Sequence, residues 1–579
     1  MDPRIVLRVN DLTTVFRNEE KITTAVNKIS FSLREGEILG IVGESGSGKS
    51  VTAFSIMGLI PFPEGRIIEG EIRFILKTGQ DINLLSLSDN QMKNFRGKEI
   101  AMIFQEPMTS LNPVYTCGSQ VEEVILRHNK IRKRAAKQRT IGLFAEVRLP
   151  APEQIYRSYP HQLSGGQKQR VMIAMAMACD PSILIADEPT TALDVTVQKT
   201  ILDLMKELQN RHRMSIIFIT HDLGLVSGFA DRVLVMYKGE IVEEGATRIL
   251  FSNPRHPYTQ GLLGCRPPRE NRLKKLPTVE DYFYKETQDG LFSISNILTK
   301  EERDSRLADI YSKIPLLEVR DLETRFISKF SMFGRKKRIV NAVNHVSFSV
   351  YPGETLGIVG ESGSGKTTLG RSILRLVDFS SGQVLFEGKE LSSLAKEELR
   401  KLRKEMQIIF QDPYSSLNPR ITAGAAIMEP MKVHSLNGTD RKRKRITIDL
   451  LEKVGLEETH FYRYPHEFSG GQRQRVCIAR ALALEPKMII CDESVSALDV
   501  SVQAQVLNLL NDLKSEFGFT YLFISHDLSV VRFMSDRLIV MKEGKIEESG
   551  DADAVFANPK TEYTRMLLRS IPGSMKSDA

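Results

Sequence analysis

A glycine-rich stretch that ends in a lysine and a hydroxyl residue occurs twice in the chain. Residues 41–50 read IVGESGSGKS, and residues 358–367 read IVGESGSGKT. Both fit the pattern G-x-x-x-x-G-K-[ST], in which glycines let backbone N–H groups turn toward phosphate oxygens and the next helix adds its positive N-terminus. The lysine of such a loop reaches the β- and γ-phosphates, and the hydroxyl reaches Mg²⁺. The chain is therefore expected to hold two phosphate-binding loops.

The same positions of the two loops are expected to bind the nucleotide. A chance glycine-rich turn is the alternative, but an apolar strand precedes each stretch and a helical pattern follows it, twice in one chain. The first loop contributes Gly43, Ser45, Gly46, Gly48, Lys49 and Ser50, and the second contributes Gly360, Ser362, Gly363, Gly365, Lys366 and Thr367.

Two pairs of neighbouring carboxylates end apolar runs of the sequence. Asp187 precedes Glu188, and Asp492 precedes Glu493. A P-loop site holds a carboxylate near its metal at such a strand end. A turn there would let both carboxylates of a pair reach one site, so that the aspartate serves Mg²⁺ and the glutamate polarises the attacking water. A surface acid pair is the alternative that a single copy would favour.

Two histidines also follow apolar runs, each at the same distance from the acid pair of its own half. They are His221, in FITHDL, and His526, in FISHDL. A lone histidine at such a place is more often structural. Its repetition at matching spacing favours a contact with the γ-phosphate.

The whole chain is a duplication. Residues 25–50 match 342–367, and the later motifs follow in the same order and spacing in both halves. We expect one module over 1–265 and a second over 314–579. Residues 266–313 between them are polar with little periodicity and are expected to be a linker. The linker aromatics Tyr282, Phe283 and Tyr284 could dock on a domain, which the sequence leaves open.

Each module is expected to have an α/β core. Short, nearly continuous apolar runs such as EILGIV, SILIAD and SIIFIT are typical of parallel strands that are covered on both faces. Amphipathic stretches such as VQKTILDLMKELQNRH are typical of helices between such strands. The sequence therefore predicts a parallel-sheet core in both halves.

Composition limits the class of protein. The chain has 579 residues, 80 Lys and Arg against 72 Asp and Glu, and a formal net charge of +8. This excess is mild for the length and is expected to be a solvated basic surface. The five scattered cysteines argue against a disulfide framework. We find no signal peptide pattern and no apolar run long enough to span a bilayer, so spanning helices are expected in other chains.

The stretches LSGGQ, 163–167, and FSGGQ, 468–472, complete a set that resembles the ATP-binding cassette ATPases. The resemblance covers nearly all of both modules. It implies that each module adds an antiparallel β subdomain and a helical subdomain to the parallel-sheet core. It also implies that two modules pair head to tail, with each ATP between the phosphate loop of one and the signature of the other. The signature residues are Ser164, Gly165, Gly166 and Gln167, and Ser469, Gly470, Gly471 and Gln472.

The resemblance assigns further residues to the site. Gln105 and Gln411 match the glutamine loops, which sense the γ-phosphate and Mg²⁺ and couple to a membrane partner. Phe16 and Phe326 match the aromatic residue that stacks on adenine, although a phenylalanine at a strand end is also typical of a core. The expected Mg²⁺ ligands are Ser50, Gln105, Asp187, Thr367, Gln411 and Asp492. Glu188, His221, Glu493 and His526 are the expected catalytic residues, so both sites are expected to hydrolyse ATP.

Within this family the stretches EPMTSLNP and NPRHPYTQGLL resemble the importer ATPases for dipeptides, oligopeptides, nickel and related solutes, here in a fused form. We expect an importer of small peptides or related solutes, with nickel as an alternative solute. Some relatives carry a cysteine-rich C-terminal segment with an iron–sulfur cluster. Only Cys265 follows the HPYTQGLL stretch, so no cluster is expected.

The importer interpretation implies partners. They are two membrane-spanning permease subunits and an extracytoplasmic substrate-binding protein, with this chain peripheral on the cytoplasmic face of the inner membrane. The rival is a soluble tandem cassette that acts on ribosomes or DNA. Ribosome-acting tandem cassettes typically read TNHLD where this chain reads TALD and SALD, and the zinc-binding cysteines of DNA-repair cassettes are absent. We therefore expect no nucleic acid partner. Exporters usually carry different loop signatures.

Overall fold

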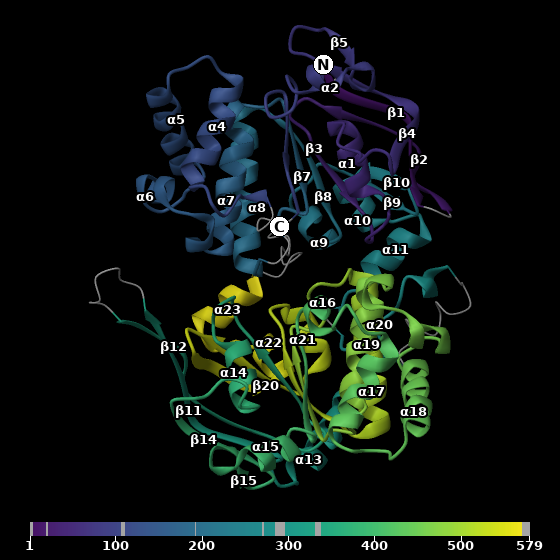
Figure 1. Cartoon of the computed structure of the whole chain (residues 1–579), viewed down its shortest axis with the longest axis vertical. Coiled ribbons are helices and arrows are strands. Elements are labelled where there is room, and N and C mark those ends of the chain that lie inside the picture. Colours follow the sequence, from purple (N-terminus) through teal and green to yellow (C-terminus); the bar gives the residue numbers. More distant parts are fainter. Residues whose placement is uncertain are drawn as a thin grey trace. The chain divides into compact units, whose positions relative to one another are not determined.

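The computed structural model describes residues 4–18, 21–105, 110–190, 193–268, 271–283, 296–329 and 337–569. The chain divides into two compact units, and the division falls between Leu263 and Gly264 (Figure 1). It lies close to the expected end of the first module. The segment expected to be a linker falls within the second unit.

The first unit contains a six-stranded sheet in the order β10-β9-β3-β8-β7-β6. All neighbours in it are parallel except β9 and β10. The expected parallel-sheet core is confirmed, since the runs EILGIV, SILIAD and SIIFIT supply β3, β7 and β8. The bounds are β3 (Ile38–Val42), β6 (Ile100–Ile103), β7 (Ile183–Asp187), β8 (Ser215–Thr220), β9 (Arg232–Tyr237) and β10 (Glu240–Ala246).

A second, antiparallel sheet of the first unit has the order β2-β1-β4-β5. Helix α1 packs between the two sheets, because its residues Ala53, Ile56 and Met57 join one buried cluster with apolar residues of both. The bounds are β1 (Ile5–Asn18), β2 (Lys21–Arg34), α1 (Lys49–Met57), β4 (Gly65–Ile75), β5 (Asp81–Asn83) and α2 (Asp89–Met92).

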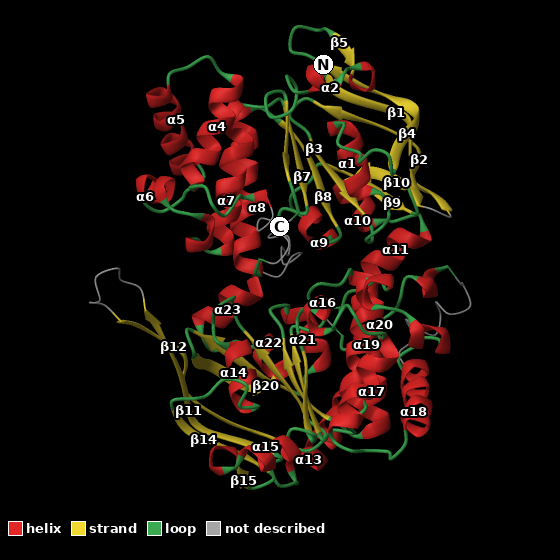
Figure 2. Ribbon diagram, in the orientation of Figure 1, coloured by secondary structure: helices red, strands yellow, loops and turns green. Residues whose placement is uncertain are grey.

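A helical subdomain of the first unit stands beside these sheets, as Figure 2 shows for α4 to α7. Its helices are α4 (Cys117–His128), α5 (Lys133–Glu146), α6 (Pro152–Arg157) and α7 (Gly165–Ala176). The remaining helices connect or follow the core strands. They are α8 (Val195–His212), α9 (Leu223–Ser227), α10 (Thr247–Ser252) and α11 (Pro257–Gly264).

The second unit repeats this architecture. Its six-stranded sheet has the order β16-β17-β18-β13-β19-β20, and its antiparallel sheet has the order β12-β11-β14-β15. The strands are β11 (Leu317–Lys329), β12 (Lys337–Val350), β13 (Thr355–Val359), β14 (Ser381–Phe386), β15 (Lys389–Glu390), β16 (Met406–Ile409), β17 (Met488–Asp492), β18 (Thr520–Ile524), β19 (Arg537–Lys542) and β20 (Lys545–Asp551).

The helices of the second unit follow the same plan. Those of the core and its C-terminal end are α14 (Lys366–Ile373), α20 (Val500–Phe517), α21 (Leu528–Met534), α22 (Ala552–Ala557) and α23 (Glu562–Arg569). The others are α15 (Lys396–Leu402), α16 (Pro413–Ser416), α17 (Ala423–Val433), α18 (Asp440–Lys453) and α19 (Gly470–Leu482).

The segment between the modules has structure of its own. It contains the 3-10 turn Glu280–Tyr282 and helix α13 (Lys300–Tyr311). Tyr282 is buried, Phe283 is 43% exposed, and Tyr284 lies outside the described residues. A capping box of Thr299 and Glu302 starts α13, which accounts for a helix where hydrophobic periodicity gave little signal.

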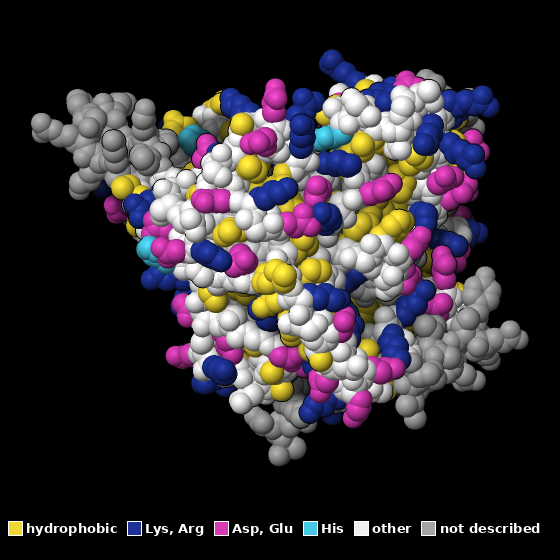
Figure 3. All heavy atoms as spheres, turned by 90° about the horizontal axis from the view of Figure 1, so that it is seen from below, with side chains coloured by type: hydrophobic (Ala, Val, Ile, Leu, Met, Phe, Trp, Pro, Cys, Tyr) yellow, Lys and Arg dark blue, Asp and Glu magenta, His cyan; other side chains and the backbone are white. Residues whose placement is uncertain are grey.

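The surface carries both signs of charge. Figure 3 shows Lys and Arg side chains interspersed with Asp and Glu over the face that it displays. The positive excess of the chain is therefore not gathered into one field on that face. In the part of the chain that the structure describes, no helix is both long and apolar enough to cross a bilayer.

Candidate functional site

Each phosphate loop joins a buried central strand to a helix. β3 lies between β8 and β9, and β13 lies between β18 and β19. The last loop residues before the helices, Gly48 and Gly365, have φ of 100°. A Cβ there would overlap the carbonyl oxygens of Ala25 and Ala342. Only glycine fits this left-handed turn, which directs the backbone N–H groups of the helix start into the loop.

The lysine of each loop folds back into it. Lys49 Nζ donates to the carbonyl oxygens of Gly43 and Glu44, each at 2.8 Å. Lys366 Nζ makes the same two bonds, also at 2.8 Å, to Gly360 and Glu361. Both side chains are almost fully buried. The ammonium groups therefore lie inside the loops, where phosphate charge would be neutralised.

The hydroxyl residue of each loop already pairs with the strand-end aspartate. Ser50 Oγ donates to Asp187 Oδ1 at 3.0 Å, and Thr367 Oγ1 donates to Asp492 Oδ1 at 2.8 Å. Both aspartates are buried, 2% and 1% exposed. Burial raises the pKa of Asp187 to about 6, although the Ser50 hydrogen bond opposes the rise. Burial raises the pKa of Asp492 as well.

These hydroxyl–carboxylate pairs fit Mg²⁺, which prefers oxygen ligands. Asp492 Oδ2 is buried and has no hydrogen-bond partner, and Arg371 Nε lies 4.0 Å from it. A buried carboxylate oxygen without a donor is costly unless a cation or water meets it. The residues present are therefore suited to the metal that a P-loop nucleotide brings with it.

The glutamate next to each aspartate gathers a glutamine and a histidine. Gln105 Nε2 donates to Glu188 Oε2 at 3.0 Å, and His221 Nδ1 lies 3.0 Å from Glu188 Oε1. This contact places the glutamine-loop residue on the glutamate, in a position that sequence reasoning did not specify. The amide and the ring fix the direction of the carboxylate from two sides.

The second unit forms the same three-residue group. Gln411 Nε2 donates to Glu493 Oε2 at 3.0 Å, and His526 Nδ1 lies 3.2 Å from the same oxygen. Burial favours a higher pKa for Glu493, but His526 and the charge of Lys366 outweigh it, so the pKa lies below its usual range. The glutamate is therefore ionised at neutral pH and able to accept a proton. Glu493 in turn raises the pKa of His526 against the opposing effect of burial.

The backbone at these glutamates turns sharply. Glu188 and Glu493 have φ of 47° and 49°, in the left-handed region that costs a non-glycine residue about 1 kcal/mol or more. Each glutamate N–H still continues the ladder, donating to Ile219 O and Ile524 O at 2.9 Å. This turn lets an aspartate and the next residue face one site, where a regular strand would point them to opposite faces.

The signature residues lie at the start of α7 and α19. Ser164 and Ser469 cap these helices by accepting from the backbone N–H groups of Gln167 and Gln472. A Cβ on Gly166 would lie 2.9 Å from Val197, so α7 approaches α8 closely there. The two serines are exposed. Their hydroxyls and the helix N-termini are presented outward on the helical subdomain of each unit.

The two phenylalanines expected at adenine lie on the antiparallel sheets. Phe16 on β1 faces Gly65 on β4 and is half-buried. Phe326 on β11 pairs with Val340 and is 44% exposed. Both rings are thus partly open to a flat ligand, and stacking on adenine stays a prediction.

Sequence reasoning missed two tyrosines that hold the phosphate loops. The backbone N–H of Glu44 donates to Tyr258 Oη at 3.0 Å, and that of Glu361 donates to Tyr563 Oη at 3.2 Å. Tyr258 is fully buried and is the second residue of α11. Tyr563 is the second residue of α23. The tyrosines could have been found from the sequence, because they stand at the same position of the matching stretches HPYTQ and TEYTR. These stretches indicated the family but gave the tyrosines no role.

None of the five cysteines, all of which lie among the described residues, forms a disulfide bond. Cys491 is fully buried in β17, and Cys179 is half-buried. Among the described residues, no group of three or more His, Cys, Asp or Glu side chains is placed to hold a metal ion. The expectation that the chain carries no iron–sulfur cluster stays a prediction.

The geometry of each unit supports one kind of chemistry. A glycine loop with a buried lysine, a hydroxyl–aspartate pair and an oriented glutamate can bind a nucleoside triphosphate and direct water at its terminal phosphate. All the predicted loop, carboxylate, glutamine and histidine residues of a unit converge there. The signature serines lie on the helical subdomain of each unit.

Comparison with known proteins places the chain among transport ATPases. The family described as ABC transporter matches residues 26–191 and 343–496. The family described as oligopeptide/dipeptide transporter, C-terminal region, matches residues 242–289 and 548–578. The latter ranges include Tyr258 and Tyr563.

Similar curated proteins extend over nearly the whole chain. The glutathione import ATP-binding protein GsiA of Salmonella choleraesuis is 50% identical over 577 residues, which cover 99% of this chain and 90% of that protein. The protein of the same name from Escherichia coli O6:H1 is 49% identical over 572 residues, with the same coverage. A solved dimeric ATP-binding cassette bound to ADP and Pi is 30% identical, with a TM-score of 0.37, and covers 41% of this chain and 98% of that one.

Proposed function

The chain belongs to the ATP-binding cassette transporter family, and from that premise we propose that it energises the import of glutathione or a similar small peptide. It is an ATP-hydrolysing subunit of an importer of the oligopeptide and dipeptide type. The observation that carries the proposal is the complete pair of sites, each with its oriented glutamate, in a chain whose relatives are named for glutathione import.

Hydrolysis is assigned to both sites. Glu188 and Glu493 accept the proton of the attacking water, since each carboxylate is held by a glutamine amide and a histidine ring. Lys49 and Lys366 neutralise phosphate charge within the loops. His221 and His526 contact the γ-phosphate through Nε2, the ring nitrogen that the glutamate does not hold. Most of the rate enhancement then comes from positioning and charge stabilisation.

Mg²⁺ is the proposed metal of both sites. Ser50 with Asp187 and Thr367 with Asp492 would hold it, and Gln105 and Gln411 would supply further oxygen ligands. When bound, the ion neutralises charge on the phosphate oxygens of the nucleotide. The buried, donor-free oxygen of Asp492 supports this assignment.

The two modules are proposed to close head to tail on two nucleotides. The exposed signature serines, Ser164 and Ser469, then donate to the γ-phosphate in the opposite module's loop. ADP offers no such oxygen, so the contact favours closure only with ATP. Phe16 and Phe326 stack on the adenine rings. One chain carrying both modules can build both sites.

The proposed partners follow from import. Two membrane-spanning permease subunits and an extracytoplasmic substrate-binding protein complete the transporter, and the chain binds on the cytoplasmic face of the inner membrane through the permease. Movement of the glutamine loops and helical subdomains on closure drives the permease helices. No nucleic acid takes part.

The test purifies the chain from native membranes as the Glu188→Gln, Glu493→Gln double variant with ATP and Mg²⁺. Two multi-span hydrophobic chains in the eluate are the expected result. The intact transporter, reconstituted in vesicles, is then assayed with labelled glutathione, a dipeptide and nickel. We expect ATP-dependent uptake of glutathione.

Three outcomes would change the proposal. Uptake of nickel without uptake of either peptide would show that the transported solute is nickel and not a peptide. Ribosomal or nucleic acid material in the eluate, with no membrane chains, would replace import by a soluble role. Uptake that persists in the double variant would contradict hydrolysis by the two glutamates.

A further inference from the structure

Residues 271–283 and 296–313 of the inter-module segment pack on the second unit, and we call these residues the strap. Its two stretches hold each other, since Lys274 N donates to Asn296 O and Leu298 N donates to Arg272 O, each at 2.8 Å. Leu273 and Ile297 form an antiparallel bridge at this point. The strap is therefore a built element with defined contacts to the core of its unit.

Arg272 of the strap caps the end of α21. Its Nη2 donates to the carbonyl oxygens of Phe533, at 3.2 Å, and Ser535, at 2.7 Å. Its side chain is 9% exposed, and Nη1 lies 3.7 Å from Asp553. A helix end leaves carbonyl groups without partners, and one guanidinium nitrogen of Arg272 satisfies two of them with a favourable charge.

The helix that Arg272 caps begins two residues after the site histidine. Asp527, which follows His526, caps the start of α21 by accepting from Ser529 N and Val530 N. A helix of seven residues is about 10 Å long at 1.5 Å per residue. A displacement at its capped end is therefore carried to the ring that orients Glu493.

A second contact joins the strap to helix α20. Leu276 N donates to Asn508 Oδ1, and Asn508 Nδ2 donates to Leu276 O, both at 2.8 Å. Asn508 lies on α20 and is 5% exposed. Only an amide side chain can donate and accept in this way, so the pairing is specific for asparagine or its close equivalents.

Helix α13 adds ion pairs to the same face of the unit. Arg303 pairs with Asp551 and with Asp553, the latter at 2.8 Å. Arg306 Nη2 lies 3.0 Å from Asp536 Oδ2. Asp536 is 2% exposed and also pairs with Lys514. Asp551 and Asp553 are partly exposed, so Asp536 is the buried acid among the three that gains a partner from α13.

The first module keeps only part of this receiving surface, namely Asp231 at the position of Asp536. By the spacing that aligns Asp187 with Asp492, the counterparts of Asp551 and Asp553 are Ala246 and Arg248. The counterpart of Asn508 is Asp203, which cannot donate to a carbonyl group when ionised. The acids that receive Arg303 and the asparagine that receives Leu276 are thus absent from the equivalent positions of the first module.

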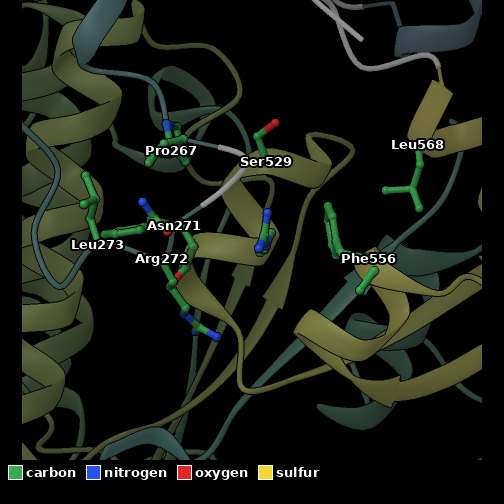
Figure 4. Close-up of a pocket in the computed structure, with 11 residues that line it drawn as sticks. Pro267, Asn271, Arg272, Leu273, Ser529, Phe556 and Leu568 are labelled. Atoms are coloured by element: carbon green, nitrogen blue, oxygen red, sulfur yellow. The ribbon is translucent and has the colours of Figure 1, made fainter. Parts of the chain in front are cut away.

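A hollow borders the contact between the strap and the helices beside it. It has a volume of about 320 Å³, with Asn271, Arg272 and Leu273 on one side and, on the other, Phe556 of α22 and Leu568 of α23 (Figure 4). Residues of α21, among them Phe533, also line it. The bonds from Arg272 join the strap to the end of α21 at the edge of this hollow.

We propose that the strap positions α21 and α20, and that Arg272 is a positioning residue for ATP turnover at the second site, acting through α21 on His526 and Glu493. The inference rests on the proposed hydrolysis at both sites. It assigns a role in that site to a segment that links it covalently to the first module, and it makes the two sites unequal in their dependence on the strap.

The test measures each site separately in the purified transporter. Vanadate traps 8-azido-ADP after turnover of 8-azido-ATP with Mg²⁺, and mass spectrometry of the photolabelled peptides gives the share trapped in each module. Arg272→Gln should lower trapping in the second module about fivefold and leave the first module unchanged, since it removes two charge-assisted hydrogen bonds. Arg272→Lys should recover part of this loss.

Two further variants separate positioning from damage. Lys275→Gln removes a strap charge whose side chain is 59% exposed, and it should change neither share. Asn508→Asp should repeat the second-module loss from the α20 side. Thermal unfolding of each variant checks that the protein remains folded at the assay temperature.

Each remaining outcome decides against the proposal. An equal fall in both modules would assign Arg272 to general stability, and unchanged trapping would assign the strap to connection alone. Trapping confined to the first module in the unmodified chain would contradict hydrolysis at the second site, and the strap's role in turnover would fall with it.

Discussion

At Asp492, in the second site, helix α14 brings Arg371 Nε to 4.0 Å, whereas the corresponding position of α1 in the first site is Phe54. The loops, lysines and glutamine–glutamate contacts around these positions agree closely. The positive charge of Arg371 offsets part of the rise that burial gives the pKa of Asp492. The reacting groups of two sites can thus be alike while their electrostatic surroundings differ.

The two sites also differ in the contacts made by the helix that follows the site histidine. The end of α21 is held by Arg272 of the strap, while the corresponding helix α9 lies in a unit without a strap. Duplication preserved the groups that meet the nucleotide, and the supporting surfaces diverged. The sites are therefore best probed by matched variants at equal positions of the two modules.

The largest effect is expected from the catalytic glutamates. Glu188→Gln and Glu493→Gln should each lower phosphate release by at least half, and the double variant about 100-fold, since a general base is lost. Phosphate release in reconstituted vesicles measures this. Glu207→Gln, at a half-exposed carboxylate of α8, serves as the control. Turnover unchanged by Glu188→Gln would show the first site to be idle.

Adding a methyl group to the central strands should separate the stabilities of the modules. A Cβ on Gly357 would overlap Val531 and Ser535, whereas one on Gly40 would lie 2.8 Å from Val226 Cγ1. Overpacking costs about 1–3 kcal/mol, so Gly357→Ala should destabilise its module more than Gly40→Ala does its own. Hydrogen exchange in increasing urea, followed for peptides of each module, measures both. Equal losses would contradict the tighter packing behind β13.

Removing one hydroxyl tests the tyrosines behind the phosphate loops. Tyr258→Phe should weaken ATP binding to the first loop about three- to tenfold, since a backbone N–H loses a buried acceptor. Tyr563→Phe should have a smaller effect, because its bond is longer. Titration with a fluorescent ATP analogue measures the affinities. Tyr414→Phe, at an exposed ring, is the control. A loss of ATP affinity there as large as for Tyr258→Phe would contradict a specific role of the Tyr258 hydroxyl in holding the loop.

The smallest effect is expected from the charge beside Asp492. Arg371 repels a second cation, so Arg371→Phe should lower the Mg²⁺ concentration for half-maximal trapping in the second module about two- to fivefold. The expected shift is modest because solvent screens the arginine, whose side chain is 45% exposed. Phe54→Arg should raise the same concentration for the first module. Shifts of the opposite sign would show that Arg371 assists the metal.

Much of this architecture could be predicted from the sequence. Nearly continuous apolar runs identified β3, β7 and β8 and their counterparts, because strands covered on both faces need apolar side chains throughout. The loops, acids and histidines could be placed because their chemistry depends on local spacing. The helix α13 could not, since its sequence is strongly polar and its pairing with Asp536 and Asp551 is long-range.

The sequence by itself determined the duplication, the α/β class and the groups that meet the nucleotide, because each depends on residue type and local order. The tertiary structure decided that Gln105 rests on Glu188, that Tyr258 holds the loop at Glu44, and that Arg272 caps α21. These contacts join residues separated by 83, 214 and 261 positions. Their partners are chosen by how the sheets and helices pack, and no local pattern records that choice.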